Sequence, residues 1–337
     1  MAFERRQVGT TDLTLPVYGF GSAPLGNLFR PIPDKDAPEL VVAAWEAGHT
    51  FIDTAPFYGS GLSERRVGEA LRQLDRSKTV ISTKVGRLLV PDANHDATQN
   101  AFFDASPFRP VFDYSYDGVM RSFEDSLQRL GTDHVEIVLV HDVGEETQGA
   151  GNLAPFETAM EGGYKALDQL RSSGAVKAIG LGVNEWQACE KAMDRGRWDV
   201  FLLAGRYTLL EQESLDSFLP RCVKERVSII IGGAFNSGIL ATGAVEGATY
   251  NYAPAPPEIR AKVDAIEAVC RAHGTPMAAA ALQFPLTHPA VASVIPGVAA
   301  LSHIERNSVL IRTEVPVGLW ADLKAEGLLR ADAPVPV

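Results

Sequence analysis

The sequence contains few cysteines and no block of basic residues. Its three cysteines, Cys189, Cys222 and Cys270, are odd in number, lack C-x-x-C spacing and fall within helical patterns. We therefore expect reduced packing residues in a cytoplasmic protein rather than a disulfide framework. Asp and Glu outnumber Lys and Arg by 42 to 31, which gives a net charge of −11. Because a surface of that sign repels phosphate, a nucleic acid partner is not expected.

Long hydrophobic runs and linker sequences are also absent. No stretch of about 18 apolar residues could span a bilayer, and residues 1–10 are not followed by the apolar segment of a signal peptide. We therefore expect no membrane partner. No Gly/Ser-rich linker divides the 337 residues, of which 46% are hydrophobic and 22% charged. This ordinary composition predicts one globular domain over residues 1–337.

The chain does contain a regular alternation of short apolar segments with longer amphipathic ones. Several short segments are apolar at consecutive positions, which indicates strands buried on both faces. The pattern predicts an α/β fold, a (β/α)8 TIM barrel. An open doubly wound sheet is the alternative, but the G-x-G-x-x-G motif of that fold is not met, because Pro24 interrupts it. The predicted strands are Val17–Gly21, Thr50–Asp53, Val80–Lys84, Val135–His141, Ala178–Val183, Val200–Ala204, Ser228–Gly232 and Val291–Ile295.

Helical spacing and cap residues mark the segments between these strands. Ser63 is expected to cap a helix that follows it, Asp117–Leu130 to end at Gly131, and Phe156–Arg171 to form another helix. Before the first strand, Phe3–Leu15 predicts a hairpin that closes the amino-terminal end of the barrel.

Three segments are too long to be simple connections, namely Gly86–Tyr116, Asp142–Pro155 and Ala241–Pro257. Each follows the carboxyl end of a predicted strand, the face on which barrels carry their active sites. The aromatic rings of the first segment either anchor it to the barrel or line a substrate pocket. They are Phe102, Phe103, Phe108, Phe112, Tyr114 and Tyr116.

Four polar residues stand at or just beyond the ends of predicted strands, where an apolar run gives no reason for them. They are Asp53, Tyr58, Lys84 and His141. Since strand ends converge on one mouth of a barrel, these side chains can meet within hydrogen-bond reach. A nearby cation favours an ionised phenol, so Lys84 is expected to lower the pKa of Tyr58. Tyr58 would then exchange a proton with a substrate oxygen that His141 also binds.

These residues carry a resemblance to the aldo-keto reductase family. The matching stretches are Phe51–Gly59, Glu64–Leu71, Ser82–Lys84 and Leu139–His141, and the resemblance extends over essentially the whole chain. It implies a (β/α)8 barrel, a nicotinamide dinucleotide bound without a Rossmann fold, and hydride transfer between carbonyl and alcohol. The four polar residues fall in the order of the family's catalytic Asp, Tyr, Lys and His.

The resemblance also implies where the cofactor would bind. Asn184 would hold the nicotinamide carboxamide and Phe235 would stack on the ring, while Val183 and Ala204 replace two residues that usually contact the carboxamide. No metal is expected. The full set of implied cofactor residues is Gly21, Ser22, Asn184, Phe235, Ser237, Gly238, Leu240, Gly297, His303 and Asn307.

The stretch after the last strand bears on the choice between NAD and NADP. In NADP-specific members of the family it supplies a Lys, a Ser and an Arg for the 2′-phosphate. Here Gly297, Val298 and His303 stand at those positions, so NAD is the expected cofactor. Arg306 is the one nearby cation that could reach a phosphate.

A narrower resemblance concerns the substrate. Phe201–Gln212, His141–Val143 and Gly182–Trp186 are similar to the branch that contains D-threo-aldose 1-dehydrogenase, also called L-fucose dehydrogenase, and pyridoxal 4-dehydrogenase. It implies oxidation of an aldose such as L-fucose, L-galactose or D-arabinose at C1 to the lactone. Pyridoxal, whose internal hemiacetal carries the same group, and general carbonyl reduction are alternatives.

Other hypotheses remain open from the sequence. The acidic residues after His141, among them Asp142, Glu145 and Glu146, either receive sugar hydroxyls or form a solvated loop. A Schiff-base aldolase that uses Lys84 is a second class of function. A non-catalytic binding subunit is a third.

Overall fold

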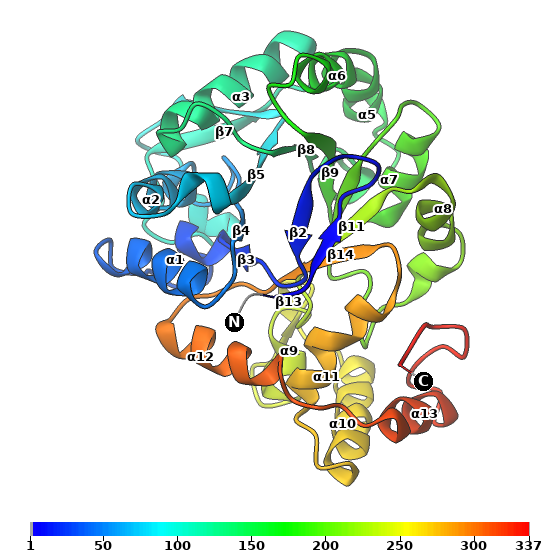
Figure 1. The fold of residues 1–337 in the computed structure, drawn as a ribbon. Coiled ribbons are helices and arrows are strands. Elements are labelled where there is room, and N and C mark those ends of the chain that lie inside the picture. The colour runs from blue at the N-terminus through cyan, green and yellow to red at the C-terminus, as the bar shows by residue number, and fades with distance from the viewer. Residues whose placement is uncertain (1–2, 337) are drawn as a thin grey trace.

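Eight parallel strands form a sheet that closes on itself. Their spatial order is β14-β11-β10-β9-β8-β5-β4-β3, and parallel bridges from Tyr18 to Val294 and from Gly21 to Gly297 join the two edges. The predicted (β/α)8 TIM barrel is therefore confirmed, and the open sheet is not formed (Figure 1). The computed structural model describes residues 3–336, so the two first residues and the last residue of the predicted domain lie outside it.

All eight predicted strands are present. The first is shorter than predicted because only Phe20–Gly21 pairs as a strand, and the fourth begins at Ile137 rather than Val135. The strands are β3 (Phe20–Gly21), β4 (Phe51–Asp53), β5 (Val80–Val85), β8 (Ile137–His141), β9 (Ala178–Val183), β10 (Val200–Ala204), β11 (Ser228–Gly232) and β14 (Val291–Ile295).

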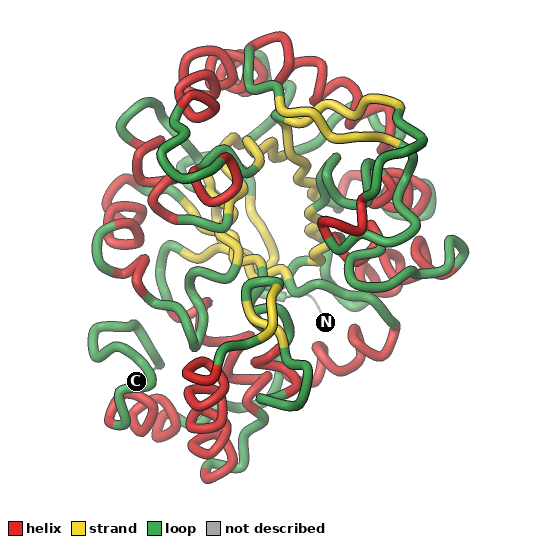
Figure 2. The backbone as a smooth tube through the Cα atoms, turned by 180° about the vertical axis from the view of Figure 1, so that it is seen from behind, coloured by secondary structure: helices red, strands yellow, loops and turns green. Residues whose placement is uncertain are grey.

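Helices surround this ring of strands, as Figures 1 and 2 show from opposite sides. The longer ones are α1 (Asp36–Glu46), α2 (Leu62–Leu71), α3 (Tyr116–Leu130), α5 (Ala154–Thr158), α6 (Tyr164–Ser172), α7 (Trp186–Met193), α8 (Phe218–Glu225), α10 (Pro257–Ala272), α11 (Met277–Gln283), α12 (Leu301–Leu310) and α13 (Val317–Ala325). Two short ones are α4 (Glu145–Gln148) and α9 (Ile239–Thr242).

All three predicted helices are present, the first of them as α2. α3 ends at Gly131, whose φ of 61° lies in the left-handed region that a glycine adopts without strain. The helix predicted over Phe156–Arg171 is longer, because α5 and α6 are joined by a π-helical turn at Ala159–Gly163.

The cap predicted at Ser63 is wrong. Gly61 occupies the cap of α2, and Ser63 lies inside the helix. Its hydroxyl donates to the carbonyl of Ser22 at 2.8 Å and does not accept a hydrogen bond from an N–H group of the first helical turn. A tertiary partner has therefore replaced the local capping bond that the sequence suggested.

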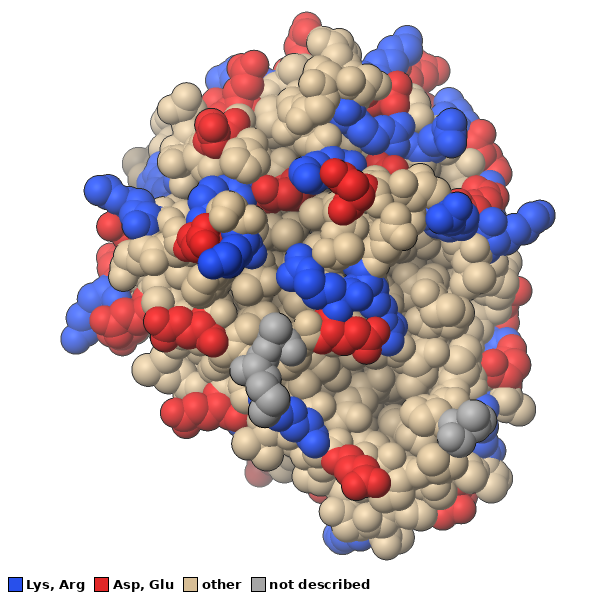
Figure 3. Space-filling model, viewed as in Figure 1, with Lys and Arg blue, Asp and Glu red and all other residues tan. Residues whose placement is uncertain are grey.

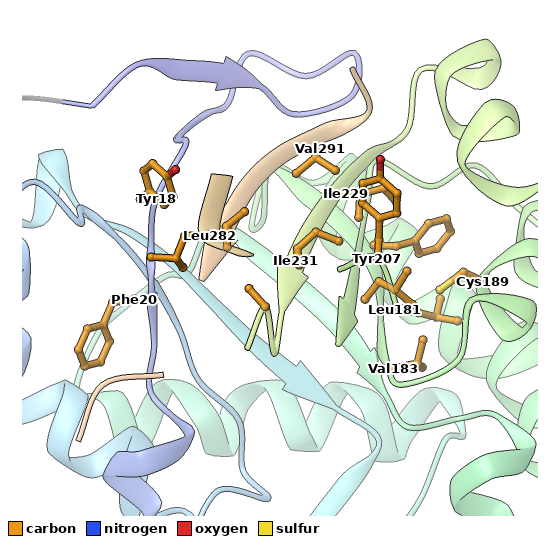
Figure 4. Packing of buried hydrophobic residues seen from close by; sticks show 14 of the residues in the cluster. Tyr18, Phe20, Leu181, Val183, Cys189, Tyr207, Ile229, Ile231, Leu282 and Val291 are labelled. Atoms are coloured by element: carbon orange, nitrogen blue, oxygen red, sulfur yellow. The ribbon is translucent and has the colours of Figure 1, made fainter. Parts of the chain in front are cut away.

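The side chains of the strands alternate between two apolar clusters. In β8, Val138 and Val140 belong to the outer cluster between strands and helices, whereas Ile137 and Leu139 belong to the inner cluster of the barrel. Figure 4 shows part of the outer cluster, with Leu181 and Val183 of β9 beside Cys189 of α7. Each fully buried aliphatic side chain of this kind contributes about 1.5–3 kcal/mol. This double burial explains why the strands are apolar at consecutive positions.

The predicted amino-terminal hairpin is formed by β1 (Arg5–Gln7) and β2 (Thr14–Pro16) and covers one end of the barrel (Figure 1). Its residues Val8, Leu13 and Leu15 are part of the inner cluster. In Figure 3, which views the same face, Lys and Arg are interspersed with Asp and Glu, so this face carries no broad surface of one charge.

The three long segments contain regular structure at the opposite end of the barrel (Figure 2). β6 (Arg87–Pro91) and β7 (Phe108–Phe112) form an antiparallel hairpin in the first segment. The third contains a smaller hairpin of β12 (Thr249–Tyr250) and β13 (Ala253–Pro254). These hairpins form a rim around the carboxyl ends of the strands.

Two further expectations concern cysteines and membranes. The three cysteines are buried and free, and they lie in helices α7, α8 and α10 as predicted. Within residues 3–336, none of the helices has the length and apolar character needed to cross a bilayer.

Candidate active site

The last inward-facing residues of three neighbouring strands are polar. Asp53 ends β4, Lys84 lies near the end of the adjacent strand β5, and His141 ends β8 on the other side of β5. His141 follows Leu139 by two residues, and Leu139 belongs to the inner cluster. Strand alternation therefore directs all three polar side chains into the carboxyl-terminal mouth of the barrel.

The Lys84 ammonium group connects the carboxylate to the phenol. Its Nζ donates to Asp53 Oδ2 at 2.8 Å, to the Thr54 carbonyl at 2.9 Å and to Tyr58 Oη at 3.1 Å. Ser82 Oγ donates to the other Asp53 oxygen at 2.7 Å. Lys84 is 1% exposed and Asp53 2%. All three ammonium protons have acceptors, so the buried charge is compensated.

Lys84 lowers the pKa of Tyr58 as expected, but burial is the larger effect in the free protein. Burial raises the pKa of Tyr58 to about 12, and the opposing effect of Lys84 is too small to offset it. Asp53 also raises the pKa of Tyr58, because its negative charge opposes that of Lys84 at the phenol. For Lys84, burial alone would lower the pKa, but the Asp53 carboxylate and Tyr58 raise it above its usual value.

His141 is neutral. Burial, followed by the charges of Arg87 and Lys84, holds the pKa of His141 well below its usual value. Its ring lies 6.0 Å from that of Tyr58, centroid to centroid, at an interplanar angle of 87°. The structure thus brings together the four residues that the sequence singled out, with the phenol protonated and the imidazole uncharged.

Sequence reasoning missed Arg87, which is 4% exposed beside His141. Its Nη1 lies 2.9 Å from His141 Nδ1, and its Nη2 donates to Asp142 Oδ2 at 2.8 Å. Its guanidinium carbon lies 4.0 Å from the centroid of the Phe57 ring. The available signal was an arginine three residues after Lys84, at the start of the aromatic-rich segment Gly86–Tyr116.

Rings of the segment Gly86–Tyr116 both anchor the loop and border the site. Phe102 is 4% exposed and packs edge-on against Phe57, with ring centroids 5.4 Å apart. The Tyr114 hydroxyl donates to the backbone carbonyl of His141 at 2.7 Å. Phe103 is 38% exposed and Phe112 is 44% exposed. Some of these rings therefore anchor the segment to the barrel, and others border the site.

The acidic residues after His141 have protein partners. Glu145 pairs with Lys191 at 3.0 Å, and Glu146 pairs with Arg206 at 3.1 Å. Together with Trp186 of α7, they line a cavity of about 530 Å³ that none of the four candidate catalytic residues lines. The carboxylates are thus engaged in ion pairs rather than pointing freely into the site.

The predicted cofactor residues lie at the same end of the barrel, but they differ in accessibility. Asn184 follows β9, Phe235, Ser237 and Gly238 follow β11, and all four are partly exposed. Gly297 follows β14 and is exposed, and His303 in α12 is partly exposed.

Other members of this set are enclosed. Gly21 and Ser22 are buried at the end of β3, and the Ser22 hydroxyl is hydrogen-bonded to that of Ser63 at 2.8 Å. Leu240 is fully buried, and its N–H donates to the Phe235 carbonyl. Ser22 and Leu240 therefore offer no free side-chain group in this conformation.

One feature fits a dinucleotide. Asn307 is 2% exposed, and its Oδ1 has no hydrogen-bond partner among residues 3–336, so it can accept a bond from the amino group of a bound base. In the loop after β11, the N–H groups of Asn236 and Gly238 donate to the carbonyls of Gly233 and Phe235.

Comparison with known proteins agrees with this arrangement. The model of the Aldo/keto reductase family matches residues 18–317. Pyridoxal 4-dehydrogenase of Microbacterium luteolum is 41% identical over 97% of this chain and 98% of its own length. D-threo-aldose 1-dehydrogenase of a Pseudomonas species is 36% identical over 94% and 95%, respectively. The expected family and branch are therefore confirmed.

Among solved structures, the holo form of aldo-keto reductase AKR11C1 from Bacillus halodurans superposes with a TM-score of 0.76. The two chains are 21% identical and each is covered to 98%. At this level of identity the likeness shows the shared barrel fold alone.

Proposed function

The chain belongs to the aldo/keto reductase family, and from this premise we propose that it oxidises an aldose at C1 to the lactone, with NAD as the preferred cofactor. The aldose, for example L-fucose, L-galactose or D-arabinose, would enter as its cyclic hemiacetal. The protein is an oxidoreductase, and enzymes of its family use nicotinamide cofactors. The observation that carries the proposal is the hydrogen-bonded series Asp53, Lys84 and Tyr58 beside the neutral ring of His141.

Each of the four side chains has a distinct task. Tyr58 accepts the proton of the C1 hydroxyl, and the hydrogen bond from Lys84 stabilises the phenolate form that does so. Asp53 keeps Lys84 charged and oriented inside the barrel. His141 binds the same substrate oxygen and fixes its position. When bound, the nicotinamide cofactor supplies the hydride acceptor.

The chain offers groups for each part of a dinucleotide. Asn184 would hold the carboxamide, Phe235 would face the nicotinamide ring, and Ser237 with Gly238 would take the pyrophosphate. The buried Oδ1 of Asn307, which lacks a partner among the described residues, supports a base at α12 because adenine carries a matching amino donor.

The preference for NAD rests on the residues where a 2′-phosphate would lie. Gly297 brings no side chain, and burial, together with Arg306 and Arg30, lowers the pKa of His303. A neutral imidazole forms no ion pair with a phosphate, whereas a hydrogen bond from a charged donor contributes about 1.5–3 kcal/mol. Arg306 and Arg30 are exposed, and they are the cations that would oppose this preference.

Pyridoxal is a second candidate substrate. The relative that oxidises it is 41% identical to this chain. In addition, Phe57 and Phe102 present aromatic surface beside Tyr58, whereas Glu145 and Glu146 are already paired and less available for sugar hydroxyls. A flat aromatic hemiacetal would suit those surroundings.

Neither alternative class of function is favoured. A Schiff-base aldolase needs a deprotonated lysine, whereas Asp53 and Tyr58 raise the pKa of Lys84. A non-catalytic binding subunit would not need the compensated buried charge of Lys84 at the mouth of the barrel. These observations support an enzyme whose partner is a small-molecule substrate.

The proposed enzyme functions as one barrel domain over residues 1–337. In support, the family model matches residues 18–317, and the pyridoxal dehydrogenase aligns over 97% of the chain.

An initial-rate screen tests the proposal. L-fucose, L-galactose, D-arabinose and pyridoxal are each offered with NAD and with NADP, and both the reduced cofactor and the lactone are measured. Methylglyoxal with NADH tests general carbonyl reduction. Lactone formation from an aldose with NAD is expected. Turnover of pyridoxal alone would select the second candidate, and absence of reduced cofactor with every compound would contradict hydride transfer.

A further inference from the structure

Arg87 is a buried cation in direct contact with the imidazole of His141. It begins β6, is 4% exposed, and places Nη1 2.9 Å from His141 Nδ1. The guanidinium carbon lies between two rings, 4.0 Å from the centroid of Phe57 and 4.8 Å from that of Phe112. Its other arm donates to Asp142 Oδ2 at 2.8 Å. The side chain is therefore held on all sides and has one orientation.

The contact determines where the imidazole carries its hydrogen. An arginine side chain is only a donor, so His141 Nδ1 must accept and cannot itself carry a hydrogen. A neutral imidazole carries one hydrogen, which must then be on Nε2. The nearest carboxylate oxygen, Asp142 Oδ2, lies 3.4 Å from Nε2, longer than a normal N–H···O bond of about 2.7–3.2 Å. The Nε2–H group thus remains available for a better acceptor.

We propose that Arg87 is a positioning residue that fixes His141 as the neutral tautomer with its hydrogen on Nε2. His141 then always presents a donor, and never a bare nitrogen, to the substrate oxygen. The statement about the substrate rests on the proposed function, whereas the tautomer is a property of the resting protein.

The backbone around Arg87 supports this role. Gly86 has a φ of 96°, and a Cβ at this position would lie 2.4 Å from Tyr114 Cε1, so only glycine permits this turn. The same tyrosine donates to the carbonyls of His141 and Asp142 at 2.7 and 3.0 Å. Ser122 Oγ donates to the Arg87 carbonyl at 3.2 Å. One ring therefore fixes both the end of β8 and the turn that delivers the arginine.

The charges that face His141 also favour the neutral form. Arg87 approaches from β6 and Lys84 from β5, and both act with burial to lower the pKa of His141. Asp142 is engaged by Arg87, and Tyr58 carries no charge because its pKa is about 12. Protonation of the ring would place an N–H at Nδ1 against the N–H of Arg87. Without Arg87, His141 is therefore expected to populate both neutral tautomers and to gain a proton at a higher pH.

Nitrogen NMR of the full-length protein, without cofactor or substrate, tests the tautomer directly. The protein is labelled with ¹⁵N-histidine, and the signals of His141 among the seven histidines are assigned with His141→Gln. We expect a bare, pyridine-type Nδ1 and a hydrogen-bearing Nε2, with no titration between about pH 5.5 and about pH 8. The opposite tautomer, or a His141 that titrates in this range, would overturn the proposal.

Variants connect the tautomer to turnover. Arg87→Met is expected to give a mixed tautomer, a titrating His141 with a new acidic limb in the pH–rate profile, and a kcat reduced by about 10- to 100-fold. Arg87→Lys retains a charged donor. It should restore much of the His141 population with hydrogen on Nε2, and much of the wild-type kcat. Arg109→Met is the matched control, because Arg109 lies on the partner strand β7 and is largely exposed beside Asp92.

The outcomes separate this inference from the proposed function. If no compound is oxidised by the wild type, the function fails while the NMR signals still decide the tautomer. If Arg87→Met does not fold, the wild-type spectrum and Arg87→Lys remain decisive. An Arg87→Met protein that is folded, keeps the wild-type tautomer and has an unchanged pH profile would contradict the proposal.

Discussion

Lys84 donates a hydrogen bond to the hydroxyl of Tyr58 at 3.1 Å, and its Nζ also lies 4.7 Å from the centroid of the Tyr58 ring. The ammonium group therefore contacts the phenol both at its oxygen and over its face. Both contacts become stronger when the oxygen gains negative charge, because a cation stabilises a phenolate more than a phenol. The pair thus favours proton transfer to Tyr58 during oxidation, even though the resting phenol is protonated.

Lys84→Met should slow oxidation and move its pH profile to higher pH. Lys84 acts to lower the pKa of Tyr58, so its loss raises that pKa further and leaves the Asp53 carboxylate uncompensated. A decrease of about 10²- to 10⁴-fold in kcat is expected. Profiles of kcat/KM measure the shift, with the exposed Lys78→Met as control. An unchanged profile would remove Lys84 from the proton transfer.

The wild-type enzyme should oxidise its substrate faster as the pH rises. With the pKa of Tyr58 at about 12, the phenolate fraction increases about tenfold for each pH unit below that value. Carbonyl reduction needs the protonated phenol, so its rate should stay level over the same range. Measurements of kcat/KM in both directions report the free enzyme. A plateau of the oxidation rate below about pH 8 would show that Tyr58 ionises far more easily than its burial allows.

Gly297→Lys should improve the use of NADP. Gly297 is exposed directly after β14, so a lysine there can extend toward a 2′-phosphate. One charge-assisted bond of about 1.5–3 kcal/mol predicts a KM for NADP that is about tenfold lower or more. Val309→Lys adds the same charge at an exposed site of α12 and serves as control. Equal effects of the two substitutions would mean that Gly297 does not face the phosphate.

The protein should lose stability as the pH falls from about 6.5 toward 4, because of two buried histidines. Burial is the main cause that lowers the pKa of His49 and of His288 to about 4. Between these values the unfolded chain binds protons that the native protein does not, so acid favours unfolding. At pH 5 the cost is about 2 kcal/mol for each histidine.

Urea unfolding at about pH 8 and about pH 5 measures this loss. His288→Asn should reduce the difference between the two pH values. If His288→Asn and the wild type lose the same free energy of unfolding, His288 does not carry the effect.

The sequence predicted the eight strands well because their two faces are both buried. Consecutive apolar residues such as those of β8 follow directly from the two clusters that sandwich each strand. The rim was harder to predict. β6 and β7 pair across a long intervening segment, and neither has the simple alternation that would identify a strand.

The site was predicted in part for a similar reason. Asp53, Lys84 and His141 stood out as polar residues at the ends of apolar strands, a local signal that strand geometry converts into proximity. Arg87 gave no such signal, because an arginine just after a strand is normally exposed. Its burial arises from contacts with Phe57 and Phe112, which lie 30 and 25 residues away in the sequence.

The central claim is that Tyr58 exchanges the proton of the substrate. The most direct measurement compares the wild type with Tyr58→Phe for the rate of NAD reduction by the aldose or by pyridoxal, alongside the Kd for NADH. The account predicts a fall of about 10²- to 10⁴-fold in rate with an unchanged Kd. A variant that lacks the phenolic oxygen yet reduces NAD at nearly the wild-type rate would contradict it.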